Sequence, residues 1–130
     1  MPYDFLIRIH MNNTNFEQAD LTYLIDLSSG NTQLIREILE LFIKQTPSDI
    51  ELLATHIAQE DWESAYKQAH HIKPTLAYVG ANQMRQELQE IEDDAKHRKS
   101  VGAIAAKLAV MLPRLDVLYG ELNAYLKTLD

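Results

Sequence analysis

The stretch from Asp61 to Ala81 reads DWESAYKQAHHIKPTLAYVGA, and its apolar residues recur every three or four positions. This spacing is the period of an α-helix with one buried face. Asp61 is a good N-cap, because its side chain can accept a hydrogen bond from an otherwise unpaired amide, and Gly80 is suited to end the helix. We therefore predict a helix between these residues. Its inward stripe comprises Trp62, Ala65, Ala69, Ile72, Leu76 and Val79.

The helical period continues upstream of this segment. A short helix is predicted from Asp20 to Leu27, ended by the sequence Ser-Ser-Gly at residues 28–30. Asn31 then supplies an N-cap for a second helix. Pro47 leaves two alternatives open, because it favours either a new helix start or one long kinked helix through to about Ile57.

The period also continues downstream, and it sets the fold class. Asn82 is predicted to cap a helix that buries Met84, Leu88, Ile91 and Ala95, and another helix is predicted from about Val101 to Leu126 with a kink at Pro113. Four long amphipathic helices with short connections pack as an antiparallel bundle. The sequence thus predicts an all-α fold, an antiparallel four-helix bundle with a short additional N-terminal helix over one end.

The first residues do not follow this period. Phe5, Ile7 and Ile9 alternate with polar neighbours, so residues 1–16 are predicted to form an N-terminal arm that is extended or poorly ordered. Residues 17–130 are assigned to the bundle, since no linker or change in composition divides them. A single domain is the expected organisation for 130 residues.

The amino-acid composition narrows the range of possible functions. The chain has 19 acidic and 12 basic residues, a net charge of -7 and no cysteine. Excess acid argues against nucleic acid or an anionic membrane as a partner, and the absence of cysteine excludes disulfides and thiolate sites. No apolar run reaches the roughly 20 residues of a membrane span, and no signal peptide is indicated. We expect a cytoplasmic monomer.

Motifs of metal and nucleophilic enzymes do not occur in the sequence. No two histidines have the i, i+4 spacing of a one-helix metal site, and neither a Gly-rich phosphate loop nor a glycine-flanked serine is present. The carboxylates that cluster in one predicted helix are interpreted as its solvated face. They are Glu87, Glu90, Glu92, Asp93 and Asp94.

The segment around His70 differs from the rest of the chain. On a helical wheel His70 falls roughly 120° from the centre of the apolar stripe, on the exposed flank. Its neighbours at i−3 and i+3 are Lys67 and Lys73, and Pro74 and Ala77 follow at i+4 and i+7. An exposed imidazole between two cations is therefore predicted in a chain that is acidic overall.

This arrangement suits an imidazole that carries a phosphoryl group. Neutral imidazole is a competent nucleophile near neutral pH, and ammonium groups beside it can pair with phosphoryl oxygens. His71 points about 100° further round the helix and lacks such surroundings. Because lysines also flank surface histidines by chance, the pattern alone leaves the phosphoryl-carrying role as a hypothesis.

The sequence AHHIKPTLAYVGA, from Ala69 to Ala81, resembles the signature of histidine-containing phosphotransfer (HPt) domains. That signature is Ala-His-any-Leu-Lys-Gly-Ser-Ser, any two residues, then Leu-Gly-Ala. The resemblance extends from about Asp20 to Ala95 and includes Leu41-Phe42 followed by Pro47. Identical positions are Ala69, His70, Lys73, Gly80 and Ala81, and conservative replacements are Ile72, Thr75 and Val79.

The resemblance implies a carrier without kinase activity in a multistep phosphorelay. His70 would accept a phosphoryl group from a receiver-domain aspartate and donate it to another, with Lys73 stabilising the group and Lys67 adding electrostatic support. Pro74 and Ala77 would contact the partner, a receiver domain of a response regulator or of a hybrid sensor kinase. The family implies that magnesium is held by the receiver, so no intrinsic cofactor or metal is expected.

Two departures from the signature keep alternatives open. Pro74 stands where the family has glycine, and Leu76 replaces a small polar residue, which fits its inward position. Proline there removes the amide that would bond the carbonyl of His70 and favours a kink. The second hypothesis is accordingly a non-catalytic adaptor that binds a receiver or a partner helix without carrying phosphate. A third is an unrelated bundle enzyme or ligand carrier, which would need buried polar groups.

Overall fold

The structure is a computed structural model that describes residues 16–129 of the chain, and the secondary structure of this part is entirely helical. The all-α prediction is therefore confirmed. The predicted arm falls on residues 1–15, outside the described residues, apart from its last residue. The helices are α2 (Thr22–Leu27), α3 (Thr32–Ala58), α4 (Trp62–Tyr78), α5 (Asn82–His97) and α6 (Val101–Thr128).

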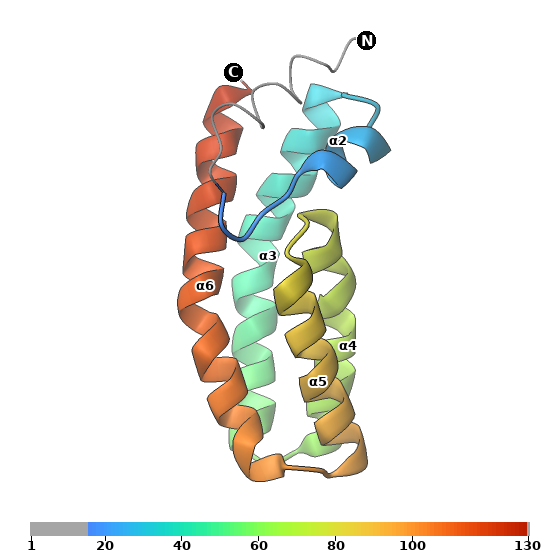
Figure 1. The fold of residues 1–130 in the computed structure, drawn as a ribbon, viewed down its shortest axis with the longest axis vertical. Coiled ribbons are helices and arrows are strands. Elements are labelled where there is room, and N and C mark those ends of the chain that lie inside the picture. Colours follow the sequence, from blue (N-terminus) through green and yellow to red (C-terminus); the bar gives the residue numbers. More distant parts are fainter. Residues whose placement is uncertain (1–15, 130) are drawn as a thin grey trace.

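The four long helices form an antiparallel bundle, and α2 lies over the end at which α3 begins (Figure 1). Helix α4 packs most extensively on α5, α3 contacts both α4 and α6, and α5 contacts α6. The core is a continuous cluster of aliphatic side chains in which the fully buried aromatic residue is Tyr125. Within residues 16–129, no helix is long and apolar enough to cross a membrane.

Helix α3 settles the alternative that the sequence left open at Pro47. It runs unbroken from Thr32 to Ala58 with Pro47 in its interior. The Asn31 side chain accepts a hydrogen bond from the Leu34 amide at 3.0 Å, which is the predicted cap. Pro47 is exposed, whereas Thr46 beside it is buried, so the helix keeps its apolar face on the core through the proline.

One detail of the sequence prediction is wrong. Asn82 is the first residue of α5 and not its cap; Ala81 holds the cap position, and no side chain satisfies the first amides. The α4–α5 turn is too short for the predicted cap, because the Ala81 amide already donates to the carbonyl of Leu76 at 3.0 Å. Trp62 packs against the core, as predicted, and is partly buried because it begins α4 at the end of the bundle.

Residues 16–21, here called the N-terminal strap, fix the α4–α5 turn. The Asp20 amide donates to the carbonyl of Val79 at 2.9 Å. Gly80 has φ +70°, and a Cβ on it would lie 2.1 Å from the Asp20 carbonyl oxygen, so glycine is required here by both conformation and space. The Glu121 carboxylate of α6 accepts hydrogen bonds from the Ala19 amide at 2.9 Å and from two preceding amides.

Candidate functional site

His70 lies midway along α4, with its side chain 71% exposed. Its chain neighbour Ala69 and the residue two positions on, Ile72, are both buried in the core. The helix therefore presents the imidazole to solvent on the flank that the wheel predicted, and this part of the sequence prediction is confirmed. Asp61 caps the same helix by accepting a hydrogen bond from the Ser64 amide at 3.2 Å, as predicted.

The imidazole of His70 is held by a carboxylate from α5. Its Nδ1 atom lies 3.2 Å from Oε1 of Glu92, and the same oxygen lies 2.9 Å from Nζ of Lys73. The side chains of Glu92 and Lys73 are only 13% and 15% exposed. The prediction of a solvated carboxylate face is thus wrong for Glu92, because the polar flank of α5 packs against α4.

The other carboxylates of the predicted solvated face differ in their exposure. Glu90 is exposed, whereas Asp93, Asp94 and Glu87 are half-buried. Asp93 accepts a hydrogen bond from Gln89 of the same helix at 3.0 Å, whereas Glu87 pairs with Arg114 of α6. Asp94 pairs with Lys107 of α6 at 2.8 Å, and this hydrogen bond raises the pKa of Lys107. These pairs hold α6 against α5 beside the site.

A regular register brings the site residues of α4 and α5 together. Lys73 donates a hydrogen bond to Gln89, one turn of α5 before Glu92. His70 faces Glu92, and one turn further down the ring of Tyr66 lies 5.9 Å from Nζ of Lys96. In each pair the two residues are equally far in sequence from Ala81, as expected for two antiparallel helices folded about that turn.

A hollow of about 290 Å³ adjoins the imidazole. Two of its lining residues, Lys67 and Lys96, are exposed lysines from different helices. Lys67 also pairs with Glu63 at 3.3 Å, in the first turn of the helix. An anionic group bound in the hollow beside His70 would lie within reach of the ammonium groups of Lys67 and Lys96. Its lining is Tyr66, Lys67, His70, Glu92 and Lys96.

His71 lacks these surroundings although it is equally exposed. Its side chain is 67% exposed and its Nε2 atom lies 3.9 Å from a carboxylate oxygen of Asp49 in α3. It therefore faces α3 and not the α4–α5 flank. The sequence prediction that His70 and His71 have different environments is confirmed.

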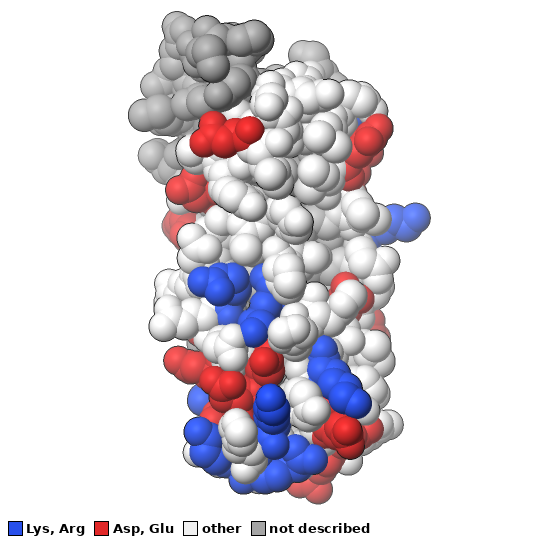
Figure 2. All heavy atoms as spheres, turned by 90° about the vertical axis from the view of Figure 1, so that its right-hand side faces the viewer, with Lys and Arg blue, Asp and Glu red and all other residues white. Residues whose placement is uncertain are grey.

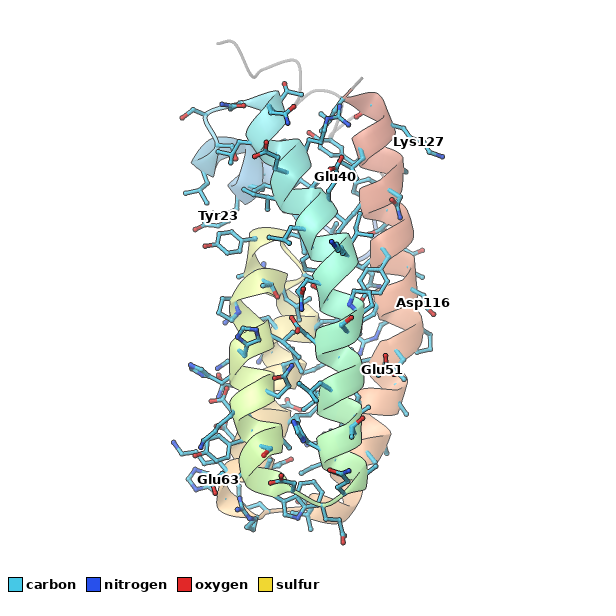
Figure 3. All side chains as sticks on the ribbon, turned by 180° about the vertical axis from the view of Figure 1, so that it is seen from behind. Tyr23, Glu40, Glu51, Glu63, Asp116 and Lys127 are labelled. Carbon is cyan, nitrogen blue, oxygen red and sulfur yellow. The ribbon has the colours of Figure 1, made fainter. Side chains whose placement is uncertain are left out.

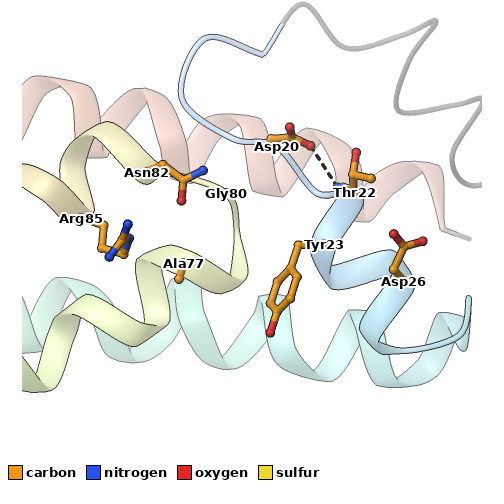
Figure 4. A pocket seen from close by; sticks show the side chains of 8 residues that line it. All are labelled: Asp20, Thr22, Tyr23, Asp26, Ala77, Gly80, Asn82 and Arg85. Carbon is orange, nitrogen blue, oxygen red and sulfur yellow. Dashed lines mark hydrogen bonds between the residues drawn. The ribbon is translucent and has the colours of Figure 1, made fainter.

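The surface beyond His70 changes from charged to mostly uncharged. Figure 2 shows Lys and Arg side chains gathered in the middle and lower parts of the α4–α5 face, among Asp and Glu, with few charges above them. In the C-terminal half of α4, Pro74 is exposed and Ala77 is half-buried. Ala77 lines an open pocket of about 540 Å³ together with Tyr23, Asp26 and Arg85 (Figure 4).

An apolar groove of about 510 Å³ runs along the other side of α4, towards α3. Seen from behind, Tyr23 of α2 lies beside the C-terminal end of α4, while Glu63 marks the opposite end of that helix (Figure 3). The ring centroids of Tyr23 and Tyr78 are 6.3 Å apart. The C-terminal half of α4 is thus bordered by this apolar groove on the α3 side and by a pocket of mixed polarity on the other side. The groove residues include Leu27, Ile38, Leu41, Phe42 and Tyr78.

The core of residues 16–129 holds little polar material that could bind a ligand. Its buried polar residues outside the tyrosines are Ser28, at the end of α2, and Thr46. In the same range no three His, Cys, Asp or Glu residues are grouped so that they could hold a metal ion. The third hypothesis, a ligand carrier or enzyme with a site inside the bundle, would need further buried polar groups.

The fold and the site together define a helical-bundle protein that presents an oriented histidine, flanked by lysines, on its surface. The family model of the Hpt domain matches residues 37–129, which is well over half of the chain. The chain therefore belongs to the Hpt domain family, whose members carry phosphoryl groups on histidine in phosphorelays. The match begins later than the sequence resemblance and extends through α6. No curated protein and no solved structure gave a match.

Proposed function

We propose that this protein is a phosphorelay intermediate in which His70 accepts a phosphoryl group from a receiver aspartate and passes it to another receiver. The observation that carries the proposal is the exposed imidazole with its Nδ1 atom engaged by Glu92. An ionised carboxylate can only accept a hydrogen bond, so the proton of the neutral ring resides on Nδ1. Nε2 then holds the free electron pair.

The proposed transfer is an in-line displacement at phosphorus. Nε2 of His70 forms the new bond to phosphorus while the bond from phosphorus to the aspartate oxygen breaks, and its electron pair stays on the carboxylate. Donation to the second receiver is the reverse sequence. The catalytic contribution of such a site is positioning and charge, because the protein has little covalent chemistry of its own to perform.

Three lysines are placed to stabilise the transferred group. Lys67 and Lys96 line the hollow beside His70, and Lys73 lies on its other side, bound to Glu92. Charge-assisted hydrogen bonds from ammonium groups to phosphoryl oxygens are short and strong. Lys67 and Lys73 were predicted from the sequence, and Lys96 is an addition from the structure. The magnesium ion that the family uses in transfer is proposed to be bound by the receiver.

The proposed docking face for the receiver is the C-terminal half of α4. Pro74 and Ala77 follow His70 along the helix, with the apolar groove on the α3 side and a pocket of mixed polarity beside Ala77. A carrier of this kind uses the same face for its donor and its acceptor, so we propose that it acts as a monomer and meets receivers in turn. Those receivers belong to response regulators or to a hybrid sensor kinase in the cytoplasm.

The test is transfer from receivers encoded beside this chain, phosphorylated with radioactive phosphate. The parent chain should acquire label that is lost in acid and kept in alkali, the behaviour of a phosphorus–nitrogen bond. His70→Gln should acquire none, whereas His71→Gln, one position away and equally exposed, should label like the parent. Label on His70→Gln would refute the proposal. Receiver binding without any label on the parent would favour the adaptor hypothesis.

A further inference from the structure

The charge on Glu92 suggests a role beyond orienting the histidine. Its carboxylate is shared between Nζ of Lys73 at 2.9 Å and Nδ1 of His70 at 3.2 Å, in a position that is only 13% exposed. Once Nε2 carries a phosphoryl group, the ring with a proton on Nδ1 is a cation. A carboxylate in partial burial stabilises that cation much more than a neutral acceptor does.

We infer that Glu92 keeps phosphorylated His70 in its protonated, reactive form and thereby makes the phosphoryl group short-lived and readily donated. This inference rests on the proposed function. It concerns the phosphorylated state, in which Lys73 can turn from Glu92 towards a phosphoryl oxygen. The carboxylate is then left with the imidazolium as its partner, so the charge pair strengthens when the group arrives.

The chemical reason lies in the leaving group. When a nucleophile attacks phosphorus, the phosphorus–Nε2 bond breaks and its electron pair passes to the ring. With a proton on Nδ1 the product is neutral imidazole, whereas without it the ring would leave as an anion. In hydrolysis the attacking oxygen comes from water, and its protons pass to the phosphate formed. Glu92 acts here as a positioning residue, because it touches the ring and not the phosphorus.

Three lysines and one carboxylate surround the ring. Lys67 and Lys96 face it across the hollow and Lys73 approaches it from the next turn, so three cations oppose protonation of the ring. Glu63 is occupied by Lys67 at 3.3 Å. Glu92 is therefore the one carboxylate among the described residues in hydrogen-bond contact with the ring.

The experiment compares the lifetime of the phosphorylated chain with that of Glu92→Gln. Both are labelled with potassium phosphoramidate, a small donor that needs no receiver, freed of donor, and followed by phosphorus NMR at neutral pH. The glutamine oxygen can still accept the Nδ1 hydrogen bond but has no charge. Its phosphorylated form should decay about three- to tenfold more slowly, the ratio expected for replacing a charged acceptor by a neutral one. Glu90→Gln, an exposed residue on the same helix, should decay like the parent.

A second measurement needs no variant. The decay rate of the labelled parent, followed against pH, should stay high to a more alkaline pH when the chain is folded than when it is unfolded in urea. Equal lifetimes of parent and Glu92→Gln, or coincident pH profiles of the folded and unfolded chains, would overturn the inference alone. A parent that takes no phosphoryl group from phosphoramidate or from any receiver would overturn the proposed function and the inference with it.

Discussion

Pro74 lies inside α4, one turn after His70, and its replacement by alanine tests how the helix supports the site. Proline has no amide hydrogen, so the carbonyl of His70 lacks the partner that an α-helix normally provides four residues later. Pro74→Ala would restore that donor without disturbing the core, because Pro74 is exposed. The helix is continuous through this position, so alanine fits the existing backbone.

The expected effect is a gain in stability of about 1–2 kcal/mol. Proline in a helix interior is about 3 kcal/mol less favourable than alanine in model helices. That figure is an upper limit here, because the surrounding helix is already adapted to the proline and alanine adds freedom to the unfolded chain. Urea unfolding followed by circular dichroism gives the change, and an unchanged slope would show that the unfolded state is comparable.

Pro113→Ala is the matched control, since Pro113 is also exposed and also interior to a long helix, α6. Both variants should gain stability, but only Pro74→Ala should change the rate of transfer from a receiver, because only Pro74 adjoins His70. A loss of stability in Pro74→Ala together with a gain in Pro113→Ala would contradict this expectation. Such a result would mean that proline stabilises the α4 conformation at the site.

Three further predictions concern the parts of the fold that hold the site. Gly80→Ala should cost about 2–4 kcal/mol, because it combines a positive φ with overlap on the strap backbone; Gly102→Ala, with open space around it, should cost nothing in the same unfolding assay. Glu121→Ala should lower the free energy of unfolding by about 1–3 kcal/mol and should speed hydrogen exchange at the Ala19 amide, which loses its acceptor. An unchanged exchange rate would contradict the role of Glu121 in holding the strap. Burial raises the pKa of Tyr125 from 10.0 to about 12. The stabilising contribution of the neutral Tyr125 side chain is therefore present below pH 10 and is lost as the pH rises towards 12. The parent should lose stability over this pH range, and Tyr125→Phe should lose less. Identical stability profiles of the two chains at alkaline pH would contradict a raised pKa of Tyr125.

The fold was predictable because its main determinants are local. Apolar residues at the helical period placed the four long helices, and caps such as Asn31 and Asp61 act within one turn of their own position. The bounds of α2 and the cap of α5 were less predictable. The start of α2 depends on the strap, which Glu121 ties down from the far end of the chain. The cap of α5 depends on the short turn that follows α4. No pattern in the sequence connects a carboxylate to amides about a hundred residues away.

The site was predictable only in the half that lies on α4. The helical wheel placed His70, Lys67 and Lys73 on one flank from their spacing alone. Glu92 and Lys96 belong to α5, and a wheel of one helix contains no information about the register of its neighbour. The turn at Gly80 would have given that register, because residues equally far from Ala81 face each other across antiparallel helices.

Identifying the phosphorylated atom is the most direct test of phosphoryl transfer through His70. The parent chain, labelled by a phosphorylated receiver, would be examined by NMR correlation between phosphorus and the ring protons of the histidines. Because Glu92 engages Nδ1, we predict a phosphorus bonded to Nε2 of His70 and to no other ring atom. Phosphorus on Nδ1 of His70, or on His71, would contradict this prediction.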